Sequence, residues 1–353
     1  MPIEESPEIH PGHRTELVVN SVALPEIDAS RCVHGLFASA TCEACANACP
    51  QRALFVSQDG LGILEENCDG CGLCEPSCPQ AAITVIGEPG LSETEAGLAL
   101  FVGCEVTGTG PGCAHRIGLR ALADAWRRGV RQIILAKMPC DTCKRCGAVA
   151  IEEACKKLNT LLSSRQAKPI QLSRLDPPEW RKAFEHARAA NPGAPNSVLS
   201  RRQLFRAVVT PVAHRPAGEP ARVFLPDTGV NPLYAFVPAI SADSCLACDA
   251  CVRICPHGAL VDLQQSYAAQ PERCVGCGLC VDICESDAVA VHPMASSPPH
   301  LQLKTRRCGA CGAPFRTPLI QAQEKQLCRI CKKFNHAQTL YQVLQDPDDD
   351  TSQ

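Results

Sequence analysis

The stretches CLACDACVRICP (residues 245–256) and CVGCGLCVDICE (residues 274–285) repeat one cysteine spacing. In both stretches, Cys-x2-Cys-x2-Cys-x3-Cys places three cysteines at two-residue intervals before a fourth. Three thiolates at this interval hold three irons of a cubane, and the fourth cysteine reaches the other cluster of a two-cluster protein. The spacing therefore predicts two [4Fe-4S] clusters that share ligands crosswise, and with them single-electron transfer.

The crosswise rule assigns ligands to each cluster of this pair. We expect one cluster on Cys245, Cys248, Cys251 and Cys284, and the second on Cys274, Cys277, Cys280 and Cys255. Pro256 follows Cys255, as in bacterial ferredoxins, whereas Glu285 follows Cys284. That departure weakens the turn signature and removes no ligand.

A less regular copy of the pattern runs from Cys42 to Cys78. Its second half is complete, but its first half has Ser39 where the first cysteine is expected. The nearest upstream thiol is Cys32, so we expect a loop over residues 33–41 to return it as the missing ligand. The predicted ligand sets are Cys32, Cys42, Cys45 and Cys78 for one cluster, and Cys68, Cys71, Cys74 and Cys49 for the other. Without Cys32, a three-iron cluster or a water-ligated iron is expected.

A second repeat accompanies the cysteines. Each fourth cysteine opens a Cys-x3-Ala step that leads into an aliphatic residue. The four steps end at Ala53-Leu54, Ala82-Ile83, Ala259-Leu260 and Ala288-Val289. Recurrence of this kind marks one supersecondary unit copied several times. It predicts short strands leaving the cluster loops and two ferredoxin-like domains.

Composition limits the alternatives for a chain of 353 residues with 26 cysteines. Disulfides need an oxidising compartment, and the first twenty residues lack the basic end and apolar stretch of a signal peptide. Zinc sites separate their cysteine pairs by a dozen residues or more, unlike these runs. No apolar stretch approaches a membrane span, and a net charge of -3 with 4% aromatics gives no support for a nucleic-acid partner. We expect a cytoplasmic protein.

The central segment has a different pattern. Apolar runs at 98–102 and 132–136 predict strands, with helices expected at 115–128 and 149–162. Five cysteines lie just beyond the two strands, where α/β sheets gather ligands, namely Cys104, Cys113, Cys140, Cys143 and Cys146. Four of them are predicted to hold a further [2Fe-2S] or [4Fe-4S] cluster, and the alternatives are inert buried thiols or a zinc site. The Gly-rich turn at 108–112 matches no nucleotide-binding spacing, and Pro111 removes an amide.

Residues 121–143, with Ala125, Gly129 and Val130 at a helix end and Cys140-x2-Cys143 after a strand, resemble the delta subunit of methyl-viologen-reducing hydrogenases. That family passes electrons between hydrogenase and heterodisulfide reductase. It typically carries an early Cys-x2-Cys pair after the first strand, whereas Cys104 and Cys113 are farther apart here. The resemblance implies an iron-sulfur site in the central segment.

Two further segments flank the second ferredoxin-like domain. Prolines interrupt residues 176–238, which we expect to form a linker with helices at 179–190 and 200–209. Its basic group (Arg201, Arg202, Arg206) is either a solvated face or a docking surface.

Two cysteine pairs follow the second ferredoxin-like domain, Cys308-x2-Cys311 and Cys328-x2-Cys331. Their spacing predicts a zinc ribbon, with rubredoxin-like iron as the alternative and His336 as an alternative ligand. A ribbon also raises the alternative of a nucleic-acid or assembly factor.

The predicted fold class is α+β multidomain, with two bacterial ferredoxin-like domains flanking a small α/β domain. The expected boundaries are 1–29 extension, 30–91 ferredoxin-like domain, 92–175 α/β domain, 176–238 helical linker, 239–296 ferredoxin-like domain, 300–340 zinc ribbon and 341–353 acidic tail. As a whole the chain resembles multi-cluster iron-sulfur subunits of molybdenum or tungsten oxidoreductases, hydrogenases and heterodisulfide-reductase-like complexes. The resemblance implies a relay to a redox partner rather than a catalyst. A disulfide-type reductase using the central cysteines is the enzymatic alternative, and no catalytic residue is identified.

Overall fold

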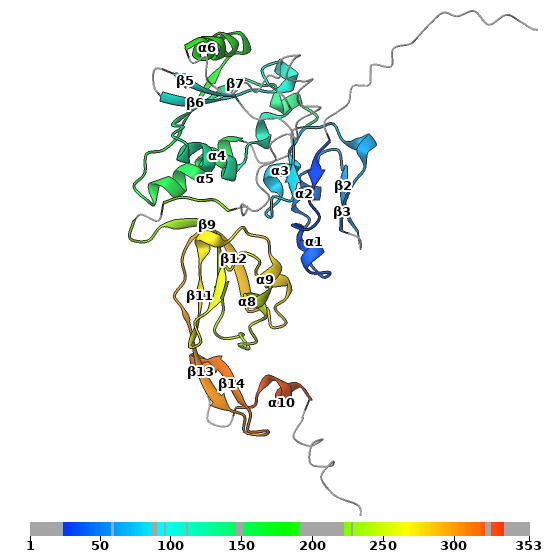
Figure 1. Cartoon of the computed structure of the whole chain (residues 1–353), viewed down its shortest axis with the longest axis vertical. Helices are drawn as coiled ribbons and strands as arrows, with labels where there is room; N and C mark the ends of the chain where they lie inside the picture. The colour runs from blue at the N-terminus through cyan, green and yellow to red at the C-terminus, as the bar shows by residue number, and fades with distance from the viewer. Residues whose placement is uncertain are drawn as a thin grey trace, which may run out of the picture.

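The computed structural model describes residues 24–57, 60–85, 90–94, 97–110, 112–145, 151–190, 222–226, 229–321 and 326–334 (Figure 1). Cys146, most of the N-terminal extension, the helix expected at 200–209 with its basic group, His336 and the acidic tail lie outside these residues.

Domain I (residues 24–85) is built from two antiparallel strand pairs and short helices. Strands β1 (Glu26–Ile27) and β4 (Ile83–Thr84) form one pair, and β2 (Leu54–Ser57) and β3 (Gly60–Ile63) form the other. The helices are α1 (Val33–Leu36), α2 (Ala44–Asn47) and α3 (Cys74–Ser77). Its core joins Leu54, Ala82 and Ile83 to cysteine side chains. Thiols therefore occupy the place that large apolar residues fill in other small domains.

Domain II (residues 229–296) repeats this plan. Strand β9 (Leu233–Ile240) pairs with β12 (Val289–Ser296), and β10 (Leu260–Asp262) pairs with β11 (Ser266–Ala269). The short helices are α8 (Ala250–Ile254) and α9 (Leu279–Asp282). The aliphatic residues predicted after Cys-x3-Ala begin strands at four places: Leu54, Ile83, Leu260 and Val289.

The central domain is a four-stranded sheet in the order β5-β6-β7-β8. Its strands are β5 (Gly90–Thr94), β6 (Gly97–Val102), β7 (Gln132–Ala136) and β8 (Gln171–Leu175). Strands β6, β7 and β8 run parallel, and β5 is antiparallel to β6. Helices α4 (Leu119–Arg127) and α5 (Ile151–Ser163) pack against one face of the sheet. The carboxyl ends of β6 and β7 consequently meet at one edge.

Helix α6 (Pro177–Ala190), in the segment predicted as a linker, covers the other face of this sheet. The indole Nε1 of Trp180 donates to the carbonyl oxygen of Ile134 at 2.9 Å, and the ring of Phe101 meets Trp180 edge-on with centroids 5.7 Å apart. Trp180 stacks on Phe184. The central domain therefore continues past residue 175, because its second face needs α6 for burial.

The ribbon (residues 301–334) continues the sheet of domain II. Strand β13 (Leu301–Arg307) pairs with β11 and with β14 (Pro314–Pro318), and α10 (Arg329–Phe334) follows. Arg316 donates to Asp262 at 2.7 Å and also binds Asp249, which accepts the Tyr267 hydroxyl. These bonds fix the ribbon to the domain beside it.

Figure 1 shows the central domain at one end of the molecule and the ribbon at the other, with domain II between them and domain I at the side. Arg165, two residues after the end of α5, is buried and donates to the carbonyl oxygen of Pro226 at 2.9 Å while lying over the ring of Tyr234. The Ser164 hydroxyl accepts the Leu233 amide at 3.0 Å. Through these contacts, β9 of domain II packs against the central domain. Among the described helices, none has the length and apolar character required to cross a bilayer.

Candidate metal centres

The cysteines of domains I and II gather into four groups. Each group takes three thiols from one sequence run and one from the other run of its domain. Quartet A is Cys32, Cys42, Cys45 and Cys78; quartet B is Cys49, Cys68, Cys71 and Cys74; quartet C is Cys255, Cys274, Cys277 and Cys280; quartet D is Cys245, Cys248, Cys251 and Cys284. The thiols of quartets B and C line two cavities. These groups have the same members as the crosswise ligand sets expected from the spacing.

The Cys-x3-Ala repeat has a structural cause. In each copy the alanine amide donates to the sulfur of the fourth cysteine, at 3.2 to 3.3 Å. The pairs are Ala53 to Cys49, Ala82 to Cys78, Ala259 to Cys255 and Ala288 to Cys284. The residue before each alanine has a positive φ, namely Arg52, Ala81, Gly258 and Asp287. This left-handed residue turns the amide towards the sulfur, and a hydrogen bond to sulfur is one means of tuning a cluster.

The loops that carry three cysteines share a second backbone feature. Residues with positive φ stand on both sides of the middle cysteine, as Gly70 and Gly72 do around Cys71. Gly276 and Gly278 surround Cys277 in the same way, and Ala247 and Asp249 surround Cys248. Around Cys42 this pair is missing. The irregular first run of domain I therefore follows another path.

That path is set by the segment between Cys32 and Cys42. Helix α1 occupies residues 33–36, and His34 Nε2 lies 2.7 Å from the carbonyl oxygen of Cys42. Cys32 is buried in the same core cluster as Cys45 and Cys78. The return loop thus brings Cys32 to quartet A, at the place where Ser39 cannot supply a thiol.

Burial raises the pKa of several quartet thiols. Burial raises the pKa of Cys74 to about 12, and the neighbouring Cys71 contributes in the same direction. Burial also raises the pKa of Cys251 to about 12, with Cys245 and Cys248 adding to it. Four neighbouring thiolates that are partly withdrawn from water repel one another unless a cationic centre compensates them. This donor set fits an iron-sulfur cluster, which binds four cysteine thiolates.

A fifth group lies at the sheet edge of the central domain. Cys104, Cys113, Cys140 and Cys143, here called the central group, line one cavity together with His115 and Arg145. Cys104 follows the end of β6 by two residues. Between them, Gly103 lies against Thr109, where a Cβ would lie 2.2 Å from the Thr109 carbonyl oxygen. The central group contains four of the five cysteines predicted from the strand ends, and the fifth, Cys146, lies outside the described residues.

His115 is a member of this cavity that the spacing did not indicate. Its Nδ1 accepts the amide of Ile151 at 3.2 Å, and its Nε2 lies 3.2 Å from the sulfur of Cys140. Because Nδ1 is an acceptor, Nε2 carries the proton and donates to Cys140. Burial lowers the pKa of His115, so the neutral ring is favoured. The only sequence signal was a histidine two residues after Cys113.

The central group borders quartet B. The amide of Cys113 donates to the carbonyl oxygen of Cys71 at 3.2 Å, and the two cysteines share a buried cluster with Leu73. Arg145 donates to Asp69 at 2.7 Å and to Glu105 at 2.8 Å, joining domain I to the central domain beside the cavity. The two groups of thiols therefore lie side by side.

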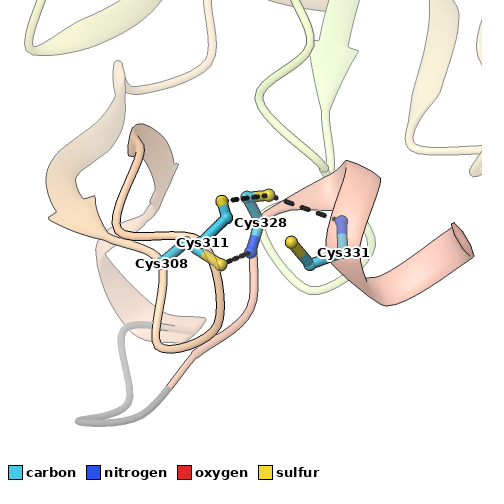
Figure 2. Close-up of side chains that lie close together, drawn as sticks. All are labelled: Cys308, Cys311, Cys328 and Cys331. Atoms are coloured by element: carbon cyan, nitrogen blue, oxygen red, sulfur yellow. Dashed lines mark hydrogen bonds between the residues drawn. The ribbon is translucent and has the colours of Figure 1, made fainter. Parts of the chain in front are cut away.

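The ribbon cysteines form a compact tetrad. The sulfurs of Cys308, Cys311, Cys328 and Cys331 all lie within 4.8 Å of one another (Figure 2). The Cys308 sulfur accepts the Cys328 amide at 3.2 Å and the Ala310 amide at 3.4 Å. Although burial opposes it, the backbone amides of Cys311, Cys328 and Ala310 lower the pKa of Cys308. Gly312 forms the tight turn after Cys311 with φ at +68°. Four thiolates in this arrangement suit a tetrahedral metal ion.

Known protein families match the cysteine-rich parts of the chain. The family model of the LdpA Fe-S cluster-binding domain matches residues 39–88. Two models of the 4Fe-4S binding domain match residues 237–260 and 269–290. The chain thus contains ferredoxin-type 4Fe-4S binding domains, which confirms the iron-sulfur prediction at this level.

Curated relatives match about a quarter of the chain. The "Electron transport protein HydN" of Escherichia coli strain K12 is 28% identical over 102 residues, which cover 26% of this chain and 58% of that protein. The proteins of the same name in Escherichia coli O6:H1 and O157:H7 give the same values. The chain spans less than two thirds of the length of these relatives.

Proposed function

We propose that this protein relays single electrons through four [4Fe-4S] clusters, one at each of quartets A to D, to or from a partner oxidoreductase. A cluster of this type, when bound, accepts and returns one electron. The crosswise quartets carry the proposal, because each takes ligands from both runs of its domain as a two-cluster ferredoxin does. The relatives named electron transport proteins support the same function.

The chain's own residues prepare these sites for electron transfer. The alanine amides at the fourth cysteines supply a fixed hydrogen bond to sulfur, and eight of the sixteen quartet cysteines are buried. Hydrogen bonding and solvent exposure both set cluster potentials. Cys248 of quartet D is exposed, unlike Cys245 and Cys251. We assign electron exchange with the partner to this exposed edge of domain II.

We further propose a fifth iron-sulfur site on the central group. Its four thiols line one cavity and lie against quartet B, and His115 directs a proton donor at Cys140. This is the part of the chain for which the delta-subunit resemblance implied a cluster. The hydrogenase and heterodisulfide-reductase-like partners implied by that resemblance are proposed on the same ground.

For the ribbon we propose one structural Zn2+ held by Cys308, Cys311, Cys328 and Cys331. The ribbon adds two strands to the sheet of domain II and is tied to it through Arg316. Its metal would stabilise this extension of the domain, because structural zinc contributes directly to folding.

The test is the content of iron, acid-labile sulfide and zinc per chain after purification without oxygen, with EPR of the reduced protein. Four cubanes and one ribbon metal give about sixteen irons and about one zinc. A loaded central group raises iron to about eighteen to twenty. About four or more zincs with little iron would contradict the electron-transfer function.

A further inference from the structure

Domains I and II, far apart in sequence, meet at a small polar junction. Thr41 donates its amide to Oδ2 of Asp282 at 3.0 Å and its hydroxyl to Oδ1 of the same carboxylate at 2.8 Å. Thr41 directly precedes Cys42 of quartet A, and Asp282 stands at the end of α9, two residues after Cys280 of quartet C. One carboxylate therefore binds the loop of one quartet from the helix that carries another.

A second contact joins the same two quartets. His257 Nε2 lies 2.7 Å from Oε1 of Gln80, whose side chain is 4% exposed. Gln80 follows Cys78 of quartet A by two residues, and His257 follows Cys255 of quartet C by two residues. Both contacts thus bind residues beside a ligand of quartet A to residues beside a ligand of quartet C.

We propose that Asp282 and His257 are positioning residues that hold quartet C of domain II against quartet A of domain I, so that electrons cross between the two domains there. This inference rests on the proposed function. Within each domain the quartets already adjoin: Cys74 of quartet B shares a core cluster with Cys45 and Cys78, and Cys251 of quartet D shares one with Cys280. The junction therefore completes one line of sites, from the central group through B, A, C and D.

The experiment compares two charge-reversal variants of the full chain. Asp282→Lys removes both acceptors of Thr41 and places a cation at the junction. Glu272→Lys makes the same charge change at an exposed carboxylate of domain II that takes no part in the two contacts. His257→Ala breaks the second contact alone and serves where Asp282→Lys yields no folded protein. Each protein is analysed for iron, for amide exchange at Thr41, and for spin coupling by low-temperature EPR after full reduction.

We expect the wild-type spectrum to show magnetic interaction between clusters of different domains. Asp282→Lys should remove that part of the interaction, keep the iron content, and speed amide exchange at Thr41 by roughly tenfold, because the amide loses its acceptor. His257→Ala should weaken the interaction, and Glu272→Lys should retain it.

Two outcomes would overturn the inference: an unchanged spectrum in Asp282→Lys with full iron content, or loss of coupling to the same extent in Glu272→Lys. Both leave the proposed function intact, because the cubanes are still present. Failure of the proposed function would be recognised differently. The wild-type protein itself would then contain far fewer than about sixteen irons per chain.

Discussion

The amide of Cys113 in the central domain donates to the carbonyl oxygen of Cys71 in domain I at 3.2 Å. This bond joins residues from two separate groups of thiols. Arg145 reinforces it by reaching from the central domain to Asp69, two residues before Cys71, with both side chains largely withdrawn from solvent. The contact between the domains is therefore made at their candidate metal centres.

Replacing Arg145 with alanine should destabilise this contact. The variant leaves Asp69 without its charged donor, and losing a hydrogen bond to a partly buried charge costs about 1–3 kcal/mol. Arg174→Ala is the matched control, because Arg174 pairs with Glu152 on a more exposed surface, where such pairs contribute about 0–1 kcal/mol. Urea unfolding followed by circular dichroism gives both values. Equal losses for the two variants would contradict a special role for Arg145.

Removing the sulfur of Cys32 should alter one cluster only. In Cys32→Ala, quartet A keeps three thiols, so we expect either a three-iron cluster, with about one iron fewer, or loss of about four irons. EPR of the oxidised protein identifies the three-iron form. Cys155→Ala removes a buried thiol of α5 that belongs to none of the five groups, and it should keep the full iron content. Wild-type iron together with an unchanged EPR spectrum in Cys32→Ala would exclude Cys32 as a ligand, because a water-ligated iron would keep the iron content and alter the spectrum.

The Cys308→Ser substitution should lower the zinc content of the protein and leave its iron content unchanged. The substitution removes one thiolate of the ribbon tetrad and the acceptor of the Cys328 and Ala310 amides. We expect about one zinc per chain to be lost while iron stays constant, measured by elemental analysis. Loss of iron with no zinc in the wild type would instead identify a rubredoxin-like ribbon.

Trp180 tests whether α6 is part of the central domain. It is 4% exposed and packs with Phe101 and Phe184 on the second face of the sheet. Trp180→Ala should cost about 3–5 kcal/mol in the free energy of unfolding, measured from the urea midpoint. His186→Ala, an exposed change on the same helix, should have little effect. A loss below about 1 kcal/mol for Trp180→Ala would show that α6 behaves as a linker.

Attachment of the ribbon should weaken in acid. Hydrogen bonding to Arg316 is the main cause that lowers the pKa of Asp262 in the folded protein. A lowered pKa stabilises the folded state above the unfolded value of about 4, and the stabilisation is lost as pH falls through the folded value. Amide exchange in β14, corrected for intrinsic rates, should rise over that window. Asp262→Asn should show the higher exchange already at neutral pH, and acid-insensitive exchange in the wild type would contradict the prediction.

Much of the architecture follows from local sequence. Strand β7 begins and ends at the predicted residues, and the four fourth cysteines lead into strands as expected. Edge strands were not anticipated: β8, with the sequence QLSRL, contains no apolar run, and none of its residues is buried. The two helices that cover the first face of the central sheet, α4 and α5, were predicted from their sequence pattern. The packing of α6 on the second face was not, because it depends on contacts of Trp180 with strands that are distant in sequence.

Some features of the candidate sites could likewise be predicted from the sequence, and others could not. Spacing predicted the regular cysteine groups, whereas Cys32 was identified as the nearest thiol upstream of Ser39, which stands at the regular position. That these cysteines hold clusters stays a prediction. Spacing could not indicate why alanine follows each fourth cysteine, since the cause is a backbone amide aimed at sulfur by a left-handed residue such as Ala81. Nor could it indicate the pairing of Thr41 with Asp282, which depends on how two folded domains pack.

The crosswise quartets also constrain how the protein is made. A ribosome releases the chain from its amino end, so Cys32, Cys42 and Cys45 emerge well before Cys78, the fourth member of their quartet. In domain II, Cys245, Cys248 and Cys251 likewise wait for Cys284. Neither quartet of a domain is complete until the second run has left the exit tunnel. Cluster insertion in each domain is consequently a late and paired event in biosynthesis, and a truncated chain ending between the two runs would carry incomplete sites.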